Sequence, residues 1–379
     1  MFPDVSLEGD TIVCVQHVLS STISLFNALF EKGLKPERLF VLGKCYSTRP
    51  DAITHLSSIG VHVSTLSSYF DPYEPFDVYF KNNLAVFWNQ TIIHLKQQEI
   101  KRLIILDDGG ELLSLMNLLI EKEPCFKDKI IGIEQTTAGY EKLKKQSLSF
   151  PIINVARSDV KLFHESPFVA KVAIERMFHH LNGLGLSPQN ALIVGAGAVG
   201  SQVADQLNGC LEVQTFDLKS TRSTLSDGRQ RLKDFDLIIG CTGSSVLYPE
   251  DFSLLKTNAC LVSVSSSDRE FNAVFIRKNK ANIMTCHDNI YAQDLYLLNC
   301  GFPINFDEAY DEIDPLEFQL TRGILLAAIY QSVSQEKDVG LIDLEQHWQK
   351  EIYTIYHQIL LDRLKQKVLP NETFSNFSL

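Results

Sequence analysis

Short apolar runs alternate with amphipathic stretches through the first half of the chain. Thr11–Val15 is a continuous run typical of a buried strand, and apolar positions then recur at helical spacing until Gly33. Because this alternation repeats, the pattern predicts a parallel sheet with helices on both of its faces. The other strands predicted here are Arg38–Gly43, Val61–Thr65, Arg102–Asp108 and Lys129–Glu134, and the other helices are Asp51–Ile59 and Tyr79–Gln98.

A second series of the same units begins at Ala191. The chain is therefore predicted to be an α/β protein with two doubly wound parallel-sheet domains. The first domain is expected over residues 1–165, completed by about 310–345, the second over 185–305, and a C-terminal helix and tail over 346–379. The strands predicted for the second domain are Ala191–Gly195, Glu212–Asp217, Asp236–Cys241 and Cys260–Ser265, and Ala170–Leu184 is predicted to be a connecting helix.

The composition is that of an ordinary globular protein, with 45% hydrophobic and 21% charged residues among 379. The net charge of −11 argues against nucleic acid and anionic membrane surfaces as partners. No stretch reaches the ~18 uninterrupted apolar residues that a membrane-spanning helix needs. The eight cysteines are scattered without a C-x-x-C pair, and the first ten residues hold acidic but no basic side chains. We therefore expect reduced thiols and a cytoplasmic location.

The segment Ala191–Gly200, ALIVGAGAVG, places a G-x-G-x-x-G motif between a predicted strand and a helical pattern. In this context the first glycine allows a tight turn, the second lets the backbone approach a pyrophosphate, and the third lets the helix pack on the strand. Asp217 follows about twenty residues on, where a carboxylate accepts hydrogen bonds from a ribose diol and favours NAD over NADP. The motif predicts an NAD-binding Rossmann domain, and the alternative is a glycine-rich turn without a ligand. The predicted cofactor contacts here are Gly195, Gly197, Ala198, Val199, Gly200 and Asp217.

Two further segments place ionisable groups where α/β sheets bind ligands. Asp107 and Asp108 end a predicted strand before two glycines, which suits either acid–base chemistry or the capping of a helix. Lys161 lies between the two domains, where an ammonium can relay a hydroxyl proton during hydride transfer or face solvent in a linker. No histidines, cysteines and acids show metal-ligand spacing, so no metal site is expected. The histidines expected to be structural or on the surface are His164, His179, His180 and His287.

Taken together, several segments resemble the S-adenosylhomocysteine hydrolase (adenosylhomocysteinase) family. The matching segments are LDDGGEL at Leu106–Leu112, GIEQTTAG at Gly132–Gly139, PIINV at Pro151–Val155 with Lys161, and the glycine motif. Weaker matches are Tyr46–Thr48, Thr242–Gly243 and Gly301–Asn305. These segments occur in the family's order and spacing from about Thr11 to Ala328.

The resemblance implies a permanently bound NAD that oxidises the 3′-hydroxyl of a nucleoside and so acidifies the neighbouring C4′ proton. Elimination of the 5′ thiol, addition of water and reduction of the ketone complete the family's reaction. The resemblance also implies that the first domain binds a small-molecule substrate in a cleft between the domains. The implied catalytic residues are His17, for acid–base work at C5′, Asp108, and Lys161 with Glu165 beside the 3′-hydroxyl. The implied NAD contacts are Thr136, Thr137, Thr242 and Asn305, and the implied substrate contact is Gln135.

The chain departs from the family at positions that recognise adenosine. Leu19 stands where the family has a threonine, Gln135 replaces a glutamate that grips the ribose hydroxyls, and Ala156 replaces an asparagine. Each exchange alters hydrogen bonding by about 1–3 kcal/mol, so we expect S-adenosylhomocysteine to be a poor substrate. The alternatives are an NAD-dependent lyase, dehydratase or dehydrogenase acting on a different substrate, and a catalytically inactive NAD-binding regulatory protein.

The last predicted element is one long helix over Leu341–Leu369. Because a helix keeps an apolar stripe only by burying it, we expect a homo-oligomer, most simply a dimer. The alternative is that this helix folds back on its own subunit. The predicted stripe consists of Leu341, Leu344, Trp348, Ile352, Ile355, Ile359 and Leu364.

Overall fold

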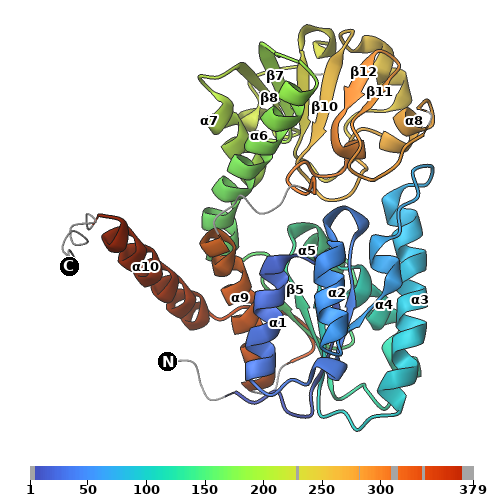
Figure 1. Ribbon diagram of the computed structural model, residues 1–379, viewed down its shortest axis with the longest axis vertical. Coiled ribbons are helices and arrows are strands. Elements are labelled where there is room, and N and C mark those ends of the chain that lie inside the picture. The colour runs from blue at the N-terminus through green and yellow to red at the C-terminus, as the bar shows by residue number, and fades with distance from the viewer. Residues whose placement is uncertain (1–4, 228–229, 281, 309–314, 335–337, 369–379) are drawn as a thin grey trace, which may run out of the picture.

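The computed structural model describes residues 5–227, 230–280, 282–308, 315–334 and 338–368. Within these ranges the chain forms two α/β domains stacked along its longest axis (Figure 1). Helix α6 (Ser166–Gly183) leads from the first domain into the second, and α9 (Pro315–Ser334) belongs to the first domain again. The predicted tail after Val368 lies outside the described residues.

The first sheet is parallel throughout the described residues, in the order β13–β6–β5–β4–β1–β2–β3. The order reverses between β1 (Thr11–Val15) and β4 (Leu103–Asp107), which pair directly. Such a reversal opens a crevice outside the carboxyl ends of the two strands, where α/β sheets bind their ligands. The remaining strands are β2 (Leu39–Leu42), β3 (His62–Val63), β5 (Ile130–Glu134), β6 (Pro151–Asn154) and β13 (Gly340–Asp343).

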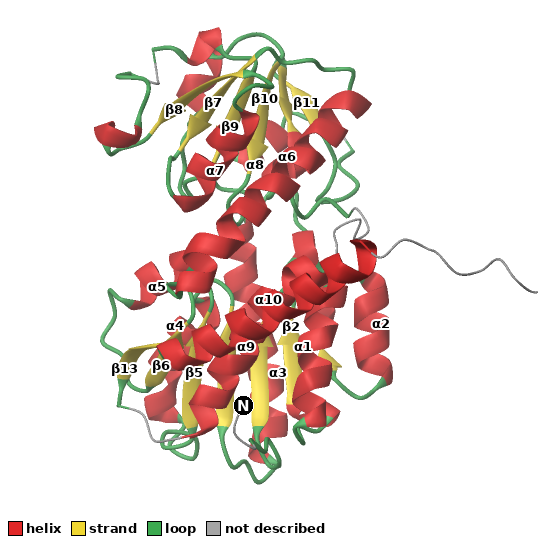
Figure 2. Cartoon of the chain, turned by 90° about the vertical axis from the view of Figure 1, so that its left-hand side faces the viewer, coloured by secondary structure: helices red, strands yellow, loops and turns green. Residues whose placement is uncertain are grey.

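Helices cover both faces of this sheet (Figure 2). One face buries side chains such as Ile12 and Val41 against apolar residues of α1, α2, α9 and α10, and the other buries Val13 and Ile105 against α3, α4 and α5. The successive buried residues of each strand therefore point to alternate cores, which explains its unbroken apolar sequence. The helices not yet bounded are α1 (Ser20–Glu31), α2 (Pro50–Ser58), α3 (Phe76–Lys96), α4 (Glu111–Leu119), α5 (Thr137–Leu143) and α10 (Gln346–Val368).

The second sheet has the order β11–β12–β10–β9–β7–β8 in the described part of the chain. Its pairs are parallel except for β11 with β12, and its order reverses between β7 (Asn190–Val194) and β9 (Leu237–Gly240). Apolar residues of α6 and α7 (Ala198–Leu207) pack together on one face. The other elements are β8 (Glu212–Phe216), β10 (Ala259–Ser263), α8 (Ala273–Arg277), β11 (Ile290–Ala292) and β12 (Leu295–Leu297).

The predicted fold class is confirmed, but the segments that form β13 and β6 differ from the prediction. The helix predicted over Leu341–Leu369 is wrong at its start, because Gly340–Asp343 is strand β13 and α10 begins at Gln346. The partner of β13 is β6, a strand that the sequence did not predict. Runs of four residues carry no distinctive period, and it is the pairing of these two distant segments that makes both of them extended.

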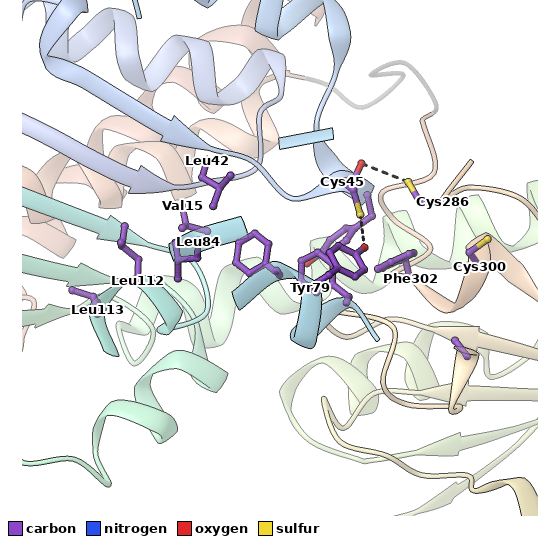
Figure 3. Packing of buried hydrophobic residues seen from close by; sticks show 14 of the residues in the cluster. Val15, Leu42, Cys45, Tyr79, Leu84, Leu112, Leu113, Cys286, Cys300 and Phe302 are labelled. Atoms are coloured by element: carbon purple, nitrogen blue, oxygen red, sulfur yellow. Dashed lines mark hydrogen bonds between the residues drawn. The ribbon is translucent and has the colours of Figure 1, made fainter. Parts of the chain in front are cut away.

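The domains share an apolar core on one side of their junction (Figure 3). Tyr46 of the first domain stacks on Phe302 of the second, with ring centroids 5.0 Å apart. The Cys286 thiol lies 3.5 Å from the Cys45 carbonyl, and the Cys45 sulfur is 3.2 Å from the Tyr79 hydroxyl. The two sheets are therefore held in a fixed relation by packing as well as by the connecting chain.

All eight cysteines lie in the described residues and are free thiols. Burial raises the pKa of Cys14 and of Cys260, so both thiols stay protonated at neutral pH. Of the helices that the described residues form, none combines the length and the apolar character needed to cross a bilayer.

Candidate functional site

A cavity of about 680 Å³ lies between the two domains. His17 and Asp108, which follow β1 and β4, line it from the first domain. Val264 and Asn305 line it from the second, with Val264 directly after β10. The cavity therefore lies at the carboxyl ends of strands from both sheets, the location at which doubly wound domains bind ligands.

His17 is held by contacts on both ring nitrogens. Its Nε2 lies 3.3 Å from Asp108 Oδ2, its Nδ1 lies 2.5 Å from Ser47 Oγ, and its ring stacks on Phe306 with centroids 4.4 Å apart. Burial lowers the pKa of His17, the nearby Lys44 and Arg322 lower it further, and together they outweigh the Asp108 carboxylate, so the imidazole is neutral at pH 7. A neutral ring has one N–H, so donation from Nε2 to Asp108 makes Nδ1 an acceptor for the Ser47 hydroxyl.

Asp108 is ionised because a buried lysine lies behind it. Lys44 Nζ donates to Oδ1 and is 4% exposed, and Gln135 Nε2 donates to Oδ2. Burial alone raises the pKa of Asp108, but Lys44 and His17 together hold it well below its usual value. Burial likewise lowers the pKa of Lys44, and Asp108 more than reverses that effect. The result is a fixed ion pair beside the His17 imidazole.

The side-chain amide of Gln135 forms its hydrogen bonds with protein groups, one of which is Asp108. Its amide oxygen accepts a hydrogen bond from Gln16 Nε2 at 3.1 Å while its amide nitrogen donates to Asp108. Both ends of the amide are therefore engaged within the protein, although the side chain lines the cavity.

Lys161 begins a π-helical turn, Lys161–Glu165, that leads into α6. Its Nζ lies 2.6 Å and 2.8 Å from the two carboxylate oxygens of Glu165, and Thr321 of α9 donates to the same carboxylate at 3.0 Å. Lys161, Glu165 and Thr321 all line the cavity. Single π-helical turns are typical of functional sites, and this one aims the ammonium into the cavity rather than into a solvated linker.

The sequence suggested either acid–base chemistry or helix capping for Asp107 and Asp108, and in the structure Asp108 faces the cavity while Asp107 caps a helix. Asp107 points away from the cavity and accepts the backbone N–H of Leu113 at 2.9 Å, which caps the first turn of α4. Glu134, opposite Asp107 in register on β5, accepts from the backbone and hydroxyl of Thr136 at 2.7 Å and 2.6 Å. Each of these two carboxyl groups also has one buried oxygen without a partner among the described residues.

The glycine motif has the geometry that a dinucleotide turn requires. Gly195 has φ of +95°, and a Cβ on Gly200 would lie 1.8 Å from the Gly195 carbonyl oxygen. A Cβ on Gly197 would meet no described atom within 4 Å, so the space beside its backbone is open. No side chain caps the N-terminus of α7, whose first turn holds no acidic residue. An uncapped helix end beside open backbone is suited to a pyrophosphate.

Asp217 and Thr242 belong to the same edge of the second sheet. Asp217 accepts the backbone N–H of Ala196 and of Lys219, both at 2.8 Å, so its carboxylate also fastens the glycine turn. Thr242 N–H donates to the buried Glu270 carboxylate at 2.6 Å. Glu270 thereby shapes the turn after β9, a positioning role that the sequence did not indicate.

The structure brings seven of the predicted site residues to the cavity wall: His17, Asp108, Gln135, Thr136, Lys161, Glu165 and Asn305. The Oδ1 of Asn305 is buried without a partner in the described chain. The glycine motif, Asp217, Thr137 and Thr242 do not line the cavity, although the first two follow strands parallel to β10. His179 and His287, expected to be structural or superficial, also line it.

Two cations near the cavity were missed for different reasons: Lys44, which pairs with Asp108 but does not itself line the cavity, and Arg322, which lines it. Lys44 follows β2, so the strand-end rule that selected Asp108 would have selected it as well. Arg322, in the middle of α9, carries no local signal, because only the packing of α9 against α1 places it in the cavity wall.

No protein-family model matches the chain. An adenosylhomocysteinase of Acinetobacter baylyi is 29% identical over 206 residues, which cover 47% of this chain and 44% of that protein. Among solved structures, a dipicolinate synthase chain from Bacillus halodurans is similar with a TM-score of 0.42 and 12% identity, covering 87% of this chain and 100% of that one.

A broader match in sequence is with the uncharacterized protein Rv0104 of Mycobacterium tuberculosis. It is 35% identical over 353 residues, which cover 90% of this chain and 69% of that protein. Identity of this extent over both domains indicates a common fold. The chain therefore belongs to the same family as the Mycobacterium tuberculosis protein Rv0104.

Proposed function

We propose that this protein is an NAD-dependent enzyme of adenosylhomocysteinase type. It oxidises a secondary alcohol transiently, carries out elimination or addition at the activated carbon, and reduces the ketone again. The substrate is a nucleoside-like compound or another vicinal diol. The observation that carries the proposal is the shared cavity, in which an ammonium–carboxylate pair and a neutral histidine face the carboxyl end of the dinucleotide-type sheet.

Lys161 is assigned to the hydroxyl that is oxidised. Its ammonium donates to Glu165, which Thr321 also holds, so the lysine is oriented toward the cavity without being free to rotate. A proton leaving the alcohol oxygen can pass through this pair, and the same pair can return it when the ketone is reduced.

His17 is assigned to proton transfer at the neighbouring carbon or leaving group. The neutral ring can accept a proton at Nδ1 through the Ser47 hydroxyl, which lines the cavity and takes up the substrate's proton as it gives its own, and Asp108 stabilises the imidazolium that then forms. Because Lys44 and Gln135 already engage Asp108, that carboxylate stays ionised and fixed during the transfer.

The residues of the second domain fit NAD. Gly197 leaves room for a pyrophosphate, the N-terminus of α7 is uncapped, and Asp217 lies where a ribose diol needs an acceptor. When bound, the dinucleotide supplies reversible acceptance of a hydride. The A. baylyi adenosylhomocysteinase, at 29% identity over half of the chain, supports the same assignment.

The NAD content of the purified protein tests the proposal. The protein is denatured and the supernatant is assayed by enzymatic cycling, and we expect NAD or NADH near one equivalent per chain. Gly197→Val is expected to lose the nucleotide, because its side chain enters the open space beside the turn, and to melt at the same temperature as wild type stripped of NAD.

Gly183→Ala is the matched control, since its added methyl group also meets no described atom within 4 Å but lies at the end of α6. This variant should keep its NAD. Folded wild-type protein that neither contains NAD nor binds added NAD would refute the proposal.

The substrate is tested separately, by homocysteine release from S-adenosylhomocysteine. The exchanges at Leu19, Gln135 and Ala156 are expected to lower efficiency about a thousandfold relative to the A. baylyi adenosylhomocysteinase. Equal efficiency would show that the cavity recognises adenosine through other contacts. Mass spectrometry of co-purifying small molecules then identifies the natural alcohol.

A further inference from the structure

Arg322 is a buried cation in the cavity wall without an acidic partner. It is 8% exposed, and its Nη2 donates to the Ser21 hydroxyl at 3.1 Å. Its Nε is buried without an acceptor, and it forms no ion pair within the described part of the chain. A buried charge of this kind is costly unless something pairs with it.

The other cations in the wall are already paired, which sets Arg322 apart from them. Each forms an ion pair with a carboxylate of its own: Arg49 with Asp51 at 2.6 Å, Lys161 with Glu165 at 2.6 Å, and Arg176 with Asp307 at 2.7 Å. Burial lowers the pKa of Arg322, and the more distant Asp108 and Glu165 raise it. Both of those carboxylates have closer lysines of their own, so neither neutralises Arg322.

The N-terminus of α1 meets Arg322 at the same place. Leu19 lines the cavity at the N-cap position and gives the helix no side-chain cap, and the first turn holds no acidic residue. The backbone N–H groups of Ser20 and Ser21 donate to no acceptor among the described residues. Arg322 donates a hydrogen bond to the Ser21 hydroxyl, so its guanidinium lies beside the N-terminus of this twelve-residue helix. The charge of the arginine and the positive end of the helix dipole therefore attract an anion to the same place.

We propose that Arg322 and the N-terminus of α1 form a subsite for an oxyanion, a carboxylate or a phosphate ester carried by the substrate. The inference rests on the proposed function in that the anion belongs to the molecule that His17 and Lys161 transform. An arginine fork and free helix N–H groups together recognise the planar carboxylate or the phosphoryl group through several charge-assisted hydrogen bonds. The substrate is thus an anionic hydroxy compound, anchored at α1 while its alcohol faces Lys161.

The test measures melting temperature against inorganic phosphate and, separately, lactate, at constant ionic strength maintained with chloride. Saturable stabilisation of ~1–3 °C is expected for the wild-type full chain with at least one of the two probes. If only phosphate stabilises the protein, the anionic group of the substrate is a phosphate ester. If only lactate stabilises it, that group is a carboxylate. Arg322→Gln should lose the response and Arg322→Lys should keep part of it.

Arg176→Gln is the matched control, because it removes a cavity arginine that already has its own carboxylate, and it should keep the full response. Any stabilisation by phosphate at the glycine motif is common to wild type and Arg322→Gln, so only the part of the response that Arg322→Gln loses is assigned to the subsite. Leu19→Asp is a second, independent variant: its carboxylate caps α1 and occupies the subsite, which should abolish the response while raising the melting temperature.

An absent response in wild type, an equal response in Arg322→Gln, or an unchanged response in Leu19→Asp would each overturn the inference. NAD is measured on the same preparations. If the protein holds NAD but shows no anion response, the proposed subsite is refuted and the proposed function is not. If the protein responds to anions but neither holds nor binds NAD, the proposed function is refuted and the anion site is supported.

Discussion

Asp108 and His17, which touch each other at the cavity, owe their charge states to different causes. Asp108 is ionised because Lys44 lies against it, and His17 is neutral because burial, together with the charges of Lys44 and Arg322, outweighs the attraction of that carboxylate. Two adjacent aspartates in the sequence, Asp107 and Asp108, thus acquire opposite pKa shifts, since Asp107 is buried without a cation in contact. Separation of this kind is typical of sites that move protons.

The residue most directly tested for catalysis is Lys161. Lys161→Ala should slow hydride transfer about 10²–10⁴-fold while NAD stays bound, because the alcohol then loses the ammonium that relays its proton to Glu165. Single-turnover nicotinamide absorbance is followed with saturating adenosine, or with the natural alcohol once it is identified. Lys171→Ala, an exposed lysine of α6, is the control and should leave the rate unchanged. An undiminished rate in Lys161→Ala would remove its assigned role.

Asp107 should make stability depend on pH. Burial raises its pKa to about 7, whereas an aspartate in the unfolded chain titrates near ~3.9. The folded state therefore binds more protons between these values, so the free energy of unfolding should fall as pH rises toward 7 and then level off. Asp107→Asn should flatten this slope and gain about 1–3 kcal/mol relative to wild type at pH 8.

Urea unfolding at pH 5 to 8 measures this dependence. In Asp107→Asn the amide can still accept from Leu113 and can donate toward the unpaired oxygen of Glu134. Asp128→Asn, at an exposed aspartate, is the control and should keep the wild-type slope. The assignment fails if both variants retain the same slope.

At the scale of elements, the N-terminus of α5 depends on a glycine contact. A Cβ on Gly139 of α5 would lie 2.2 Å from the carboxyl carbon of the buried Glu134, which holds Thr136. Gly139→Ala should therefore cost about 1–3 kcal/mol of unfolding free energy and displace Thr136 from the cavity wall. Denaturant unfolding compares it with Gly183→Ala, which has open space and should be neutral or slightly stabilising. Equal stability of the two variants would contradict this account.

The apolar stripe of α10 divides between two environments. Its first half is buried on its own subunit through Trp348 and Ile352, whereas Ile355 and Ile359 are 44% and 47% exposed. The homo-oligomer stays a prediction, and the interface should use this exposed half. Light scattering should find a dimer for wild type and a monomer for Ile355→Glu/Ile359→Glu, with Thr354→Glu as a dimeric control. A monomeric wild type would contradict it.

At the scale of the whole molecule, α3 fixes one domain on the other. The Phe76 N–H at its start donates to Asp268 of the second domain at 3.2 Å, and Asp268 pairs with the fully buried Arg277. This polar contact lies beside the apolar core of the junction, because the Phe76 ring packs against Tyr46 and Phe302. The cavity is thereby bounded by domains that are already docked.

Phe302→Ala tests that docking. Removing this buried ring should cost about 3–5 kcal/mol and should split one calorimetric unfolding transition into two, because the domains then lose their shared core. Phe275→Ala, at a ring 37% exposed in the second domain, should cost less than about 1 kcal/mol and keep a single transition. A single transition in Phe302→Ala would indicate that the connecting segments couple the domains instead.

The sequence by itself determined the features that local chain geometry encodes. Buried parallel strands need continuous apolar runs, so β1, β4, β5 and β7 were predicted within one residue of their bounds. The turn at Gly195 requires positive φ, and the close packing at Gly200 requires the absence of a side chain, so the motif specifies its own conformation. Ordered matches along the chain also selected His17, Asp108 and Lys161, which the fold gathers around one cavity.

Tertiary structure alone decided which segments pair and which charges are buried together. Strand β13 is extended because it pairs with β6, although its four residues have no strong intrinsic preference. Lys44 meets Asp108 across 64 positions of sequence, and Arg322 meets Ser21 across 301. The pKa of such a group depends on its burial and on partners that long-range packing brings to it, and the residues next to it in the sequence reveal neither.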